Sequence, residues 1–229
     1  TAIHEVSVVE NGTSNKLSWE RGATIDILKV ALSTPLLPTE KVTILLDCTV
    51  KVADDKFTRY GVDNFGNYKL RYWFISPAVY SDGWKAYPNK NSDDLFLNPS
   101  NFNIKFSIPN GYTITSNFEE GESFTTANGM KVVSLKGEKR THAIIHIERK
   151  YSFETIVTDK LTLVTSLKDK KVSPAMKALA VDRIVHFLDG KLGAYPFKTM
   201  MTTEEAYKKA PVIGLNQLPD YISPFPDGF

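Results

Sequence analysis

Short apolar runs separated by turn residues fill the first 150 residues, and this spacing constrains the fold more than any other feature. The runs ATIDILKVAL, KVTILLDCTV, FNIKFSIP and MKVVSLKG alternate with turn sequences such as NGT, NFGN, PNG, EEGE and ANG. ATIDILKVAL and FNIKFSIP alternate apolar and polar residues, which is typical of strands with one buried face. No helical pattern separates the runs, so residues 1–155 are predicted to form an antiparallel β-sandwich or saddle.

The pattern changes after about residue 155, where a strand, a helix and a second strand are predicted in succession. KLTLVTSL and FKTMMTTEE have the composition of strands, and SPAMKALAVDRIVHFLDG lies between them. Ser173 is the expected N-cap, Pro174 suits the first helical position, and Gly190 is expected to end the helix. The chain is therefore predicted to be mainly β, with a β-α-β segment within residues 156–229. The apolar residues at helical spacing are Met176, Leu179, Ala180, Ile184, Phe187 and Leu188.

Composition and charge exclude several kinds of partner. The chain has 229 residues, of which 42% are hydrophobic and 24% charged, the values of an ordinary globular protein. A formal net charge of +2 gives no reason to expect nucleic acid or an anionic membrane. No apolar run approaches the roughly 20 residues of a transmembrane helix. The single cysteine, Cys48, lies in VTILLDCTV and is expected to be a buried small hydrophobe.

The stretch HAIIH, residues 142–146, resembles the zinc-peptidase helix motif H-E-x-x-H but does not fit it. Ala143 stands where the motif has its glutamate, and the surrounding THAIIHIERKYSF favours a strand. On a strand, residues four apart are separated by roughly 13 Å, too far for both to bind one zinc ion. His142 and His146 are therefore predicted to be structural or solvent-facing, and no metal site is predicted in the chain.

Other chemically suggestive residues also have an ordinary structural interpretation. His186 has no second ligand four residues to either side, where Asp182 and Gly190 stand, so a surface or interface histidine is expected. The acidic pairs Asp54–Asp55 and Asp93–Asp94 lack a third oxygen ligand at calcium-loop spacing and are expected in solvated turns.

Aromatic residues are concentrated in KLRYWFISPAVY and in the sequence that follows it. Trp73, Trp84 and Tyr87 belong to this concentration. Aromatic residues on strands usually fill a core, which is the favoured interpretation here. The alternative is an exposed platform for carbohydrate or peptide.

Three segments resemble the front of M1-family zinc aminopeptidases, the gluzincins. LSTPLLPTEKVTILLD resembles the family's "P-L-x-P-x-E" turn between two strands. FNIKFSIPNGYTITSNFE resembles an element that ends in Ser-Asn, matched here by Ser116 and Asn117. AVDRIVHFLDGKLGAYPFKTMMTTEE resembles the helix that precedes "F-G-x-Y-P", with Gly193, Tyr195 and Pro196 in place. The "A-R-x-x-F-P-C-x-D-E-P" segment has no counterpart.

This resemblance implies an M1-like β domain over residues 1–155, followed by the truncated start of a thermolysin-like α/β catalytic domain over 156–229. The family's G-x-M-E-N loop, whose glutamate binds the substrate amine, has Gly214-Leu215-Asn216-Gln217 as its nearest counterpart. The neutral amides of Asn216 and Gln217 can hydrogen-bond a peptide but supply no anion. The other interpretation is that this loop only links two elements.

Two functional hypotheses follow. In the first, the chain is the N-terminal fragment of an M1-like metallopeptidase, and its β domain walls and caps a peptide-binding cleft. In the second, the parent protein is a non-catalytic homologue that binds partners through the aromatic surface around Trp73 and Trp84. Under both hypotheses, no catalytic residue and no cofactor is expected in this chain, although the full-length parent could bind zinc. The expected partner is the remainder of the parent's catalytic-type domain.

The ends of the sequence suggest a piece of a longer, processed protein. The chain starts at Thr1 without methionine and stops within PDYISPFPDGF, which has no cap or polar tail. The GLNQLP…SPFPDGF ending resembles a divergent branch of M1-like proteins from Bacteroidetes-type bacteria. A periplasmic or cell-surface location is accordingly favoured over the cytoplasm.

Overall fold

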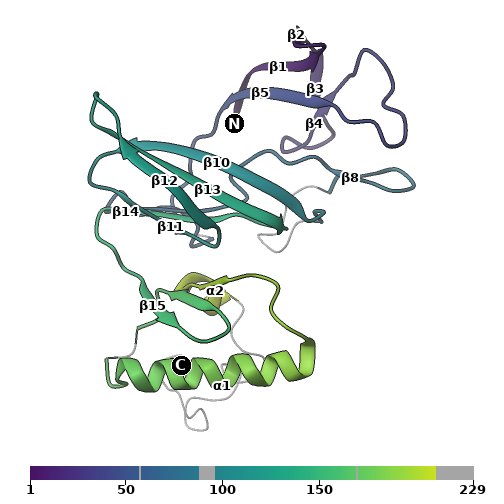
Figure 1. Cartoon of the computed structure of the whole chain (residues 1–229). Helices are drawn as coiled ribbons and strands as arrows, with labels where there is room; N and C mark the ends of the chain where they lie inside the picture. Colours follow the sequence, from purple (N-terminus) through teal and green to yellow (C-terminus); the bar gives the residue numbers. More distant parts are fainter. Residues whose placement is uncertain (57, 88–95, 169, 210–229) are drawn as a thin grey trace. The chain divides into compact units, whose positions relative to one another are not determined.

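The computed structural model describes residues 1–56, 58–87, 96–168 and 170–209, and the chain divides into two compact units (Figure 1). Unit 1 comprises Thr1–Ala53 and Trp73–Asn98, and unit 2 comprises Asp54–Tyr72 and Pro99–Phe229. Both units are therefore discontinuous in sequence. No helix in the described part of the chain is long and apolar enough to cross a membrane.

Unit 1 is built on a three-stranded antiparallel sheet with strand order β2-β1-β5. Val6 and Val8 of the central strand are almost completely buried and form its small core. The apolar run of β5 was predicted, but β1 was not, because His4 and Glu5 interrupt its apolar residues. The strands of this unit are β1 (Ala2–Glu10), β2 (Thr13–Lys16), β3 (Trp19–Arg21), β4 (Leu28–Val30), β5 (Thr43–Thr49), β8 (Val79–Tyr80) and β9 (Trp84–Lys85).

Two of the predictions for unit 1 need correction. The run ATIDILKVAL forms only the short strand β4, because Thr24 to Ile27 make a turn in which the Ile27 N–H donates to the Thr24 carbonyl. Cys48 is only partly buried, since it lies on β5, most of whose side chains are exposed.

The first sheet of unit 2 consists of β10 (Ser100–Pro109), β13 (Met130–Arg140) and β12 (Glu119–Thr125), with β13 in the centre. Val133 and Leu135 of β13 supply its most deeply buried side chains. EEGE, predicted as a turn, is instead the start of β12. Every side chain of β12 is exposed, so its glutamates remain in water at the edge of the sheet.

The second sheet of unit 2 has the strand order β11-β14-β7-β6 and contains HAIIH. Its strands are β6 (Gly61–Val62), β7 (Tyr68–Arg71), β11 (Thr113–Ser116) and β14 (Ile144–Glu148). All five residues of β14 are buried. The prediction that HAIIH forms a strand is confirmed for its last three residues: Ile144, Ile145 and His146 lie within β14, and His142 lies two residues before it.

Asn117 joins the end of β11 to the entry of β14. Its Oδ1 accepts from the Ile144 N–H at 2.9 Å, and its Nδ2 donates to the His142 carbonyl at 3.2 Å. Its backbone N–H donates to the Ile144 carbonyl at 3.4 Å. The side chain is buried, so these bonds satisfy polar groups that water cannot reach.

The C-terminal part of unit 2 is a β-α-β arrangement, as predicted. β15 (Glu154–Val157) pairs antiparallel with β16 (Thr162–Thr165), and β16 pairs parallel with β17 (Thr199–Thr202). Figure 1 shows the crossover helix α1 (Pro174–Leu192) lying alongside β15. Lys177 of α1 donates to Glu154 of β15 at 2.8 Å and ties the two elements together. A short helix, α2 (Glu204–Lys209), follows β17.

The ends of α1 confirm one prediction and correct another. The Ser173 Oγ accepts from the Met176 N–H at 3.3 Å, and Pro174 begins the helix. Gly190 does not end it. The helix continues to Leu192, and Gly193, with a φ of 90°, donates its N–H to the Asp189 carbonyl. The helix stops where a glycine takes up the left-handed region, and Gly190 has no such φ.

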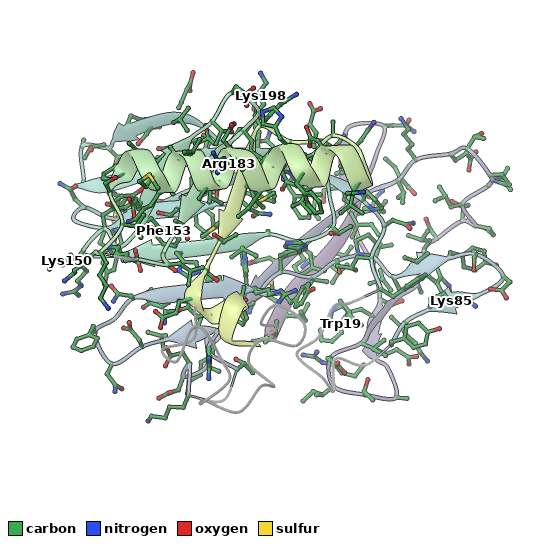
Figure 2. The ribbon with its side chains drawn as sticks, turned by 90° about the horizontal axis from the view of Figure 1, so that it is seen from below. Trp19, Lys85, Lys150, Phe153, Arg183 and Lys198 are labelled. Atoms are coloured by element: carbon green, nitrogen blue, oxygen red, sulfur yellow. The ribbon has the colours of Figure 1, made fainter. Side chains whose placement is uncertain are left out.

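The large apolar side chains of α1 face outward rather than towards β15. Val185 is the buried residue of the helix, and the small Ala178 and the larger Val181 on the same side are partly buried. By contrast, Met176 is 57% exposed, Ile184 57% and Phe187 63%. In Figure 2 the helix crosses the front of the view with Arg183 on it.

The fold class matches the prediction: the described part of the chain is mainly β, with antiparallel sheets followed by a β-α-β unit. The expected domain boundary at residue 155 stays a prediction.

We expect Asn117→Ala to lower the free energy of unfolding by roughly 1–3 kcal/mol, because it leaves the Ile144 N–H and the His142 carbonyl buried without their partners. Urea unfolding of the chain measures this. Asn103→Ala, at an exposed position of β10, is the matched control and is expected to change stability by less than about 0.5 kcal/mol. Equal losses in both variants would contradict the assigned role of Asn117.

Candidate functional site

The predicted substrate loop, Gly214, Leu215, Asn216 and Gln217, lies outside the described residues, as does the Asp93–Asp94 pair. The substrate role of the loop therefore stays a prediction. The structure does describe the segment that leads towards it, from β17 into α2.

This approach segment is firmly anchored. Thr203 is 1% exposed, and its Oγ1 accepts from the Ala206 N–H at 3.1 Å, which caps α2. The Glu204 N–H donates to the Ser166 Oγ at 2.9 Å, just beyond β16. The Thr203 cap thus stabilises the first turn of α2, and the Glu204 N–H ties this turn to the residue that follows β16.

The carboxylate of Glu205, on α2, forms an ion pair with the second sheet of unit 2. The Lys69 ammonium on β7 lies 2.8 Å from Glu205 Oε1 and 3.5 Å from Asp55 Oδ2. Burial opposes the charge on Lys69, but the hydrogen bond and the charges of the two carboxylates outweigh it and raise the pKa of Lys69. The prediction that the Asp54–Asp55 pair lies in a solvated turn is therefore wrong for Asp55, which is partly buried, whereas its neighbour Asp54 is exposed.

The same ion pair acts on Glu205. Burial alone would raise the pKa of this carboxyl, but the hydrogen bond and charge of Lys69 lower it below its ordinary value. The side chains of Lys69 and Glu205 are only 20% and 13% exposed, so the pair lies largely out of water. Neither residue was singled out from sequence, because the pair brings together distant parts of the chain.

His146 lies beside this pair in the most buried part of the sheet. It is 1% exposed, and its ring meets Phe153 edge-on with 5.1 Å between centroids (Figure 2 labels Phe153). Burial lowers the pKa of His146 to about 4, with an opposing contribution from Glu205 and a supporting one from Lys69. Among the described residues, neither His146 Nε2 nor Glu205 Oε2 has a hydrogen-bond partner. This is a buried neutral imidazole, as the structural interpretation predicted.

The segment that resembles "F-G-x-Y-P" serves packing in this structure. The guanidinium of the buried Arg140, at the end of β13, stacks over the Phe197 ring at 3.4 Å from its centroid. Tyr195 meets Phe197 edge-on at 5.4 Å. The chain between α1 and β17 is thereby held against the first sheet of unit 2.

Asp159, Asp182 and His186 form a cluster of possible metal ligands. His186 Nε2 lies 3.4 Å from Asp159 Oδ1 and 3.6 Å from Asp182 Oδ1. The prediction that His186 lacks a ligand four residues away is corrected, because Asp182 supplies a carboxylate at that position. The i,i+4 spacing was visible in the sequence, but the contribution of Asp159 from the β15–β16 turn was not.

The prediction of an aromatic core is wrong for Tyr80, Trp84 and Tyr87 of unit 1, which are exposed, as is the nearby Phe96. Tyr80 and Trp84 meet edge-on across the β8–β9 hairpin with 5.1 Å between centroids, and Tyr87 meets Phe96 at 6.2 Å. The exposed fractions are 64% for Tyr80, 70% for Trp84, 64% for Tyr87 and 59% for Phe96. Lys85, labelled in Figure 2, lies on the same hairpin. The β8–β9 hairpin has two residues in each strand and is too short to bury Tyr80 and Trp84 in a core, whereas Trp73 is partly buried.

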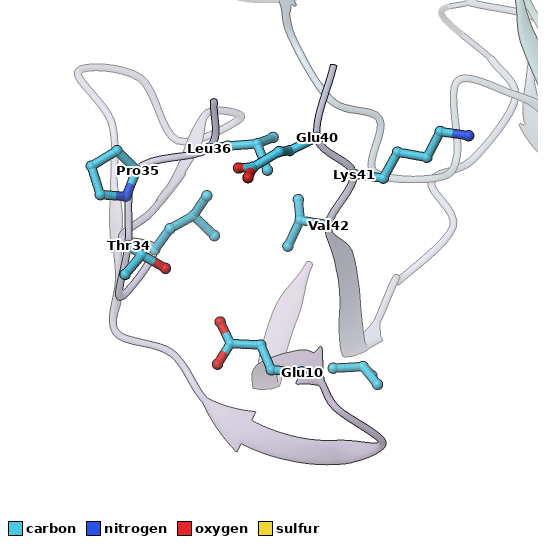
Figure 3. A pocket seen from close by; sticks show the side chains of 9 residues that line it. Glu10, Thr34, Pro35, Leu36, Glu40, Lys41 and Val42 are labelled. Carbon is cyan, nitrogen blue, oxygen red and sulfur yellow. The ribbon is translucent and has the colours of Figure 1, made fainter. Parts of the chain in front are cut away.

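Unit 1 also contains a groove of about 310 Å³ beside the PLLPTE turn (Figure 3). Glu10 and Glu40 line it, but both carboxylates have partners within the unit. Glu40 accepts from the Leu37 N–H at 2.9 Å, and Glu10 accepts from the Ser33 hydroxyl at 3.3 Å. The carboxylates stabilise the loop rather than present a site. The lining residues are Val9, Glu10, Leu32, Thr34, Pro35, Leu36, Glu40, Lys41 and Val42.

Comparison with solved structures identifies the fold. A crystal structure of an M1 zinc metallopeptidase from Deinococcus radiodurans matches with a TM-score of 0.54 and 17% identity. A mutant of a two-domain M1 zinc metallopeptidase bound to L-arginine matches with a TM-score of 0.53 and 18% identity. Each match covers 88% of this chain and 46% of the other. No protein-family model and no curated protein matches the sequence.

The chain thus spans about half the length of the solved structures that it matches. At this level of identity the likeness establishes architecture. The chain has the fold of the N-terminal part of M1 zinc metallopeptidases.

The burial of His146 predicts a loss of stability in mild acid. In the unfolded chain the His146 imidazole has its ordinary pKa of 6.5, whereas in the folded chain its pKa is about 4. Between these two pH values the chain takes up a proton when it unfolds. The contribution of His146 to the free energy of unfolding is therefore complete above pH 6.5 and is lost as the pH drops towards 4. We expect a decrease on the order of 3 kcal/mol, to be measured by urea unfolding at a series of pH values.

His146→Gln removes the titrating group, so its free energy of unfolding is expected to change less between pH 6.5 and pH 4. His4→Gln, at an exposed position of β1, should retain the wild-type slope. An unchanged slope in His146→Gln would show that other groups cause the acid sensitivity.

Proposed function

We propose that this chain is the N-terminal part of an M1-like metallopeptidase homologue, in which the β domain walls and caps a peptide-binding cleft. The match of 88% of the chain to M1 zinc metallopeptidases carries this proposal. The strand-helix-strand arrangement of β16, α1 and β17 supports it, because a parallel unit of this kind is usually covered by further elements.

The partner of this chain is then the remainder of the parent's catalytic-type domain. The outward face of α1 presents Ile184, Phe187 and Leu192, which are 57%, 63% and 81% exposed. Burying such side chains stabilises by about 1.5–3 kcal/mol each. An adjoining part of the domain that covers this face would bury them.

Catalysis is assigned to sequence outside these 229 residues. The chain contains no H-E-x-x-H, and its HAIIH lies on and next to a strand. The only histidine of that strand, His146, is enclosed and beside a lysine, which does not fit a catalytic zinc site with an open position. This chain contributes cleft wall and substrate contacts, with Gly214–Gln217 as the contacting loop.

A second candidate function is that of a non-catalytic binding module. The exposed rings of Tyr80, Trp84, Tyr87 and Phe96 favour it, since solvent-exposed aromatic pairs are common in recognition surfaces. The ligand would be a carbohydrate or a peptide that contacts these exposed rings.

The 229-residue chain alone is expected to give no turnover of an aminoacyl anilide, whereas a full-length parent that retains H-E-x-x-H is expected to be active. In that parent, replacing Asn216 and Gln217 by alanine should weaken peptide binding by about tenfold, since two neutral hydrogen bonds are lost. Asn103→Ala is the control. Wild-type peptide affinity in the loop variant, with its fold intact, would exclude the substrate role of the loop.

For the binding-module hypothesis, Trp84→Ala with Tyr87→Ala is expected to weaken binding to the best ligand of an oligosaccharide and peptide panel by at least about tenfold. Intrinsic fluorescence titration measures it. Trp19→Ala, at the less exposed Trp19 of the same unit, should bind as the wild type does. Equal affinity of both variants would exclude the aromatic surface as the binding site.

A further inference from the structure

We propose that Asp159, Asp182 and His186 bind a divalent transition-metal ion, zinc by its ligand chemistry, which ties α1 to the β15–β16 turn. Two carboxylates and one imidazole form a ligand set that zinc accepts, and three protein ligands leave a position for water. The proposal rests on these three residues alone and does not depend on the proposed function.

The distances between the ligand atoms suit a metal shell. Zinc lies about 2.1 Å from nitrogen and oxygen ligands, so two ligands in a tetrahedral shell are about 3.4 Å apart. His186 Nε2 lies 3.4 Å from Asp159 Oδ1 and 3.6 Å from Asp182 Oδ1. All three ligand atoms lie within 4.8 Å of one another, so small side-chain rotations bring the two carboxylates to the same ion.

The negative charge of the two carboxylates also favours binding of a cation at this position. Asp159 and Asp182 bring two negative charges to one imidazole, and neither forms an ion pair with a lysine or arginine in the described part of the chain. Lys160, the neighbour of Asp159, instead lies 3.9 Å from Asp189. A divalent ion would compensate both carboxylates.

The supporting backbone holds the ligands in place before an ion arrives. Asp182 and His186 lie one turn apart on the same side of α1. The turn that carries Asp159 is closed by Thr158, whose Oγ1 accepts from the Lys160 N–H at 3.3 Å and the Leu161 N–H at 3.1 Å. The side chains of Asp159 and His186 are 61% and 48% exposed, so an ion can enter from solvent.

Metal binding is tested directly on the 229-residue chain after treatment with a chelator. Equilibrium dialysis with zinc, followed by elemental analysis, is expected to give one ion per chain. Cobalt(II) in place of zinc should give a visible d–d absorption band that zinc removes. Zinc should also raise the thermal unfolding temperature, because it binds the folded chain.

Two variants at one position and a matched control locate the ion. His186→Ala is expected to weaken zinc binding more than about tenfold and to abolish the thermal shift, because the imidazole ligand is lost. His186→Cys should restore zinc binding and add a thiolate charge-transfer band in the cobalt spectrum, because cysteine is itself a zinc ligand. The control is Asp189→Asn, which removes a carboxylate of the same helix that faces Lys160, and it should bind zinc as the wild type does.

Each remaining outcome decides against the proposal. If the wild-type chain takes up no zinc up to millimolar concentration, the cluster is only a histidine paired with two carboxylates. If His186→Ala retains the ion with unchanged affinity, the ion binds elsewhere. Because no peptide enters these measurements, their failure leaves the proposed function untouched.

Discussion

The burial of β14 is the constraint on which unit 2 depends. All five of its residues are buried, and it pairs with β11 on one side and with β7 on the other. A strand enclosed in this way must have all its backbone groups paired, so β7, from a distant part of the sequence, is required to complete the sheet. Asn117 fixes the entry of the strand, and His146 and its neighbours pack around its centre.

Sequence patterns within a single segment predicted the elements whose formation depends mainly on that segment. Alternation predicted β10, and the Ser173–Pro174 cap predicted the start of α1. The sequence did not indicate β12, because a strand at a sheet edge with every side chain in water has no apolar periodicity. The end of α1 was misplaced because Gly190 and Gly193 are equivalent in sequence, and only the backbone conformation distinguishes them.

The candidate sites were harder to predict, because tertiary contacts create them. Lys69 and Glu205 are ordinary surface residue types until β7 and α2 meet. Asp182 and His186 were visible at helical spacing, but Asp159 joins them only through the packing of a turn against α1. The exposure of Trp84 was missed for a related reason: composition favours a core for aromatic residues, and only the short hairpin keeps this one in solvent.

The discontinuity of the two units has a consequence for synthesis on the ribosome. The chain passes between the units three times, at residues 53–54, 72–73 and 98–99. After β7 has paired with β6, its other edge has no partner until β14 emerges, a delay of roughly 4–15 s at about 5–20 residues per second. The nascent chain therefore carries an open strand edge for seconds, and no single cut in the polypeptide can release either unit whole.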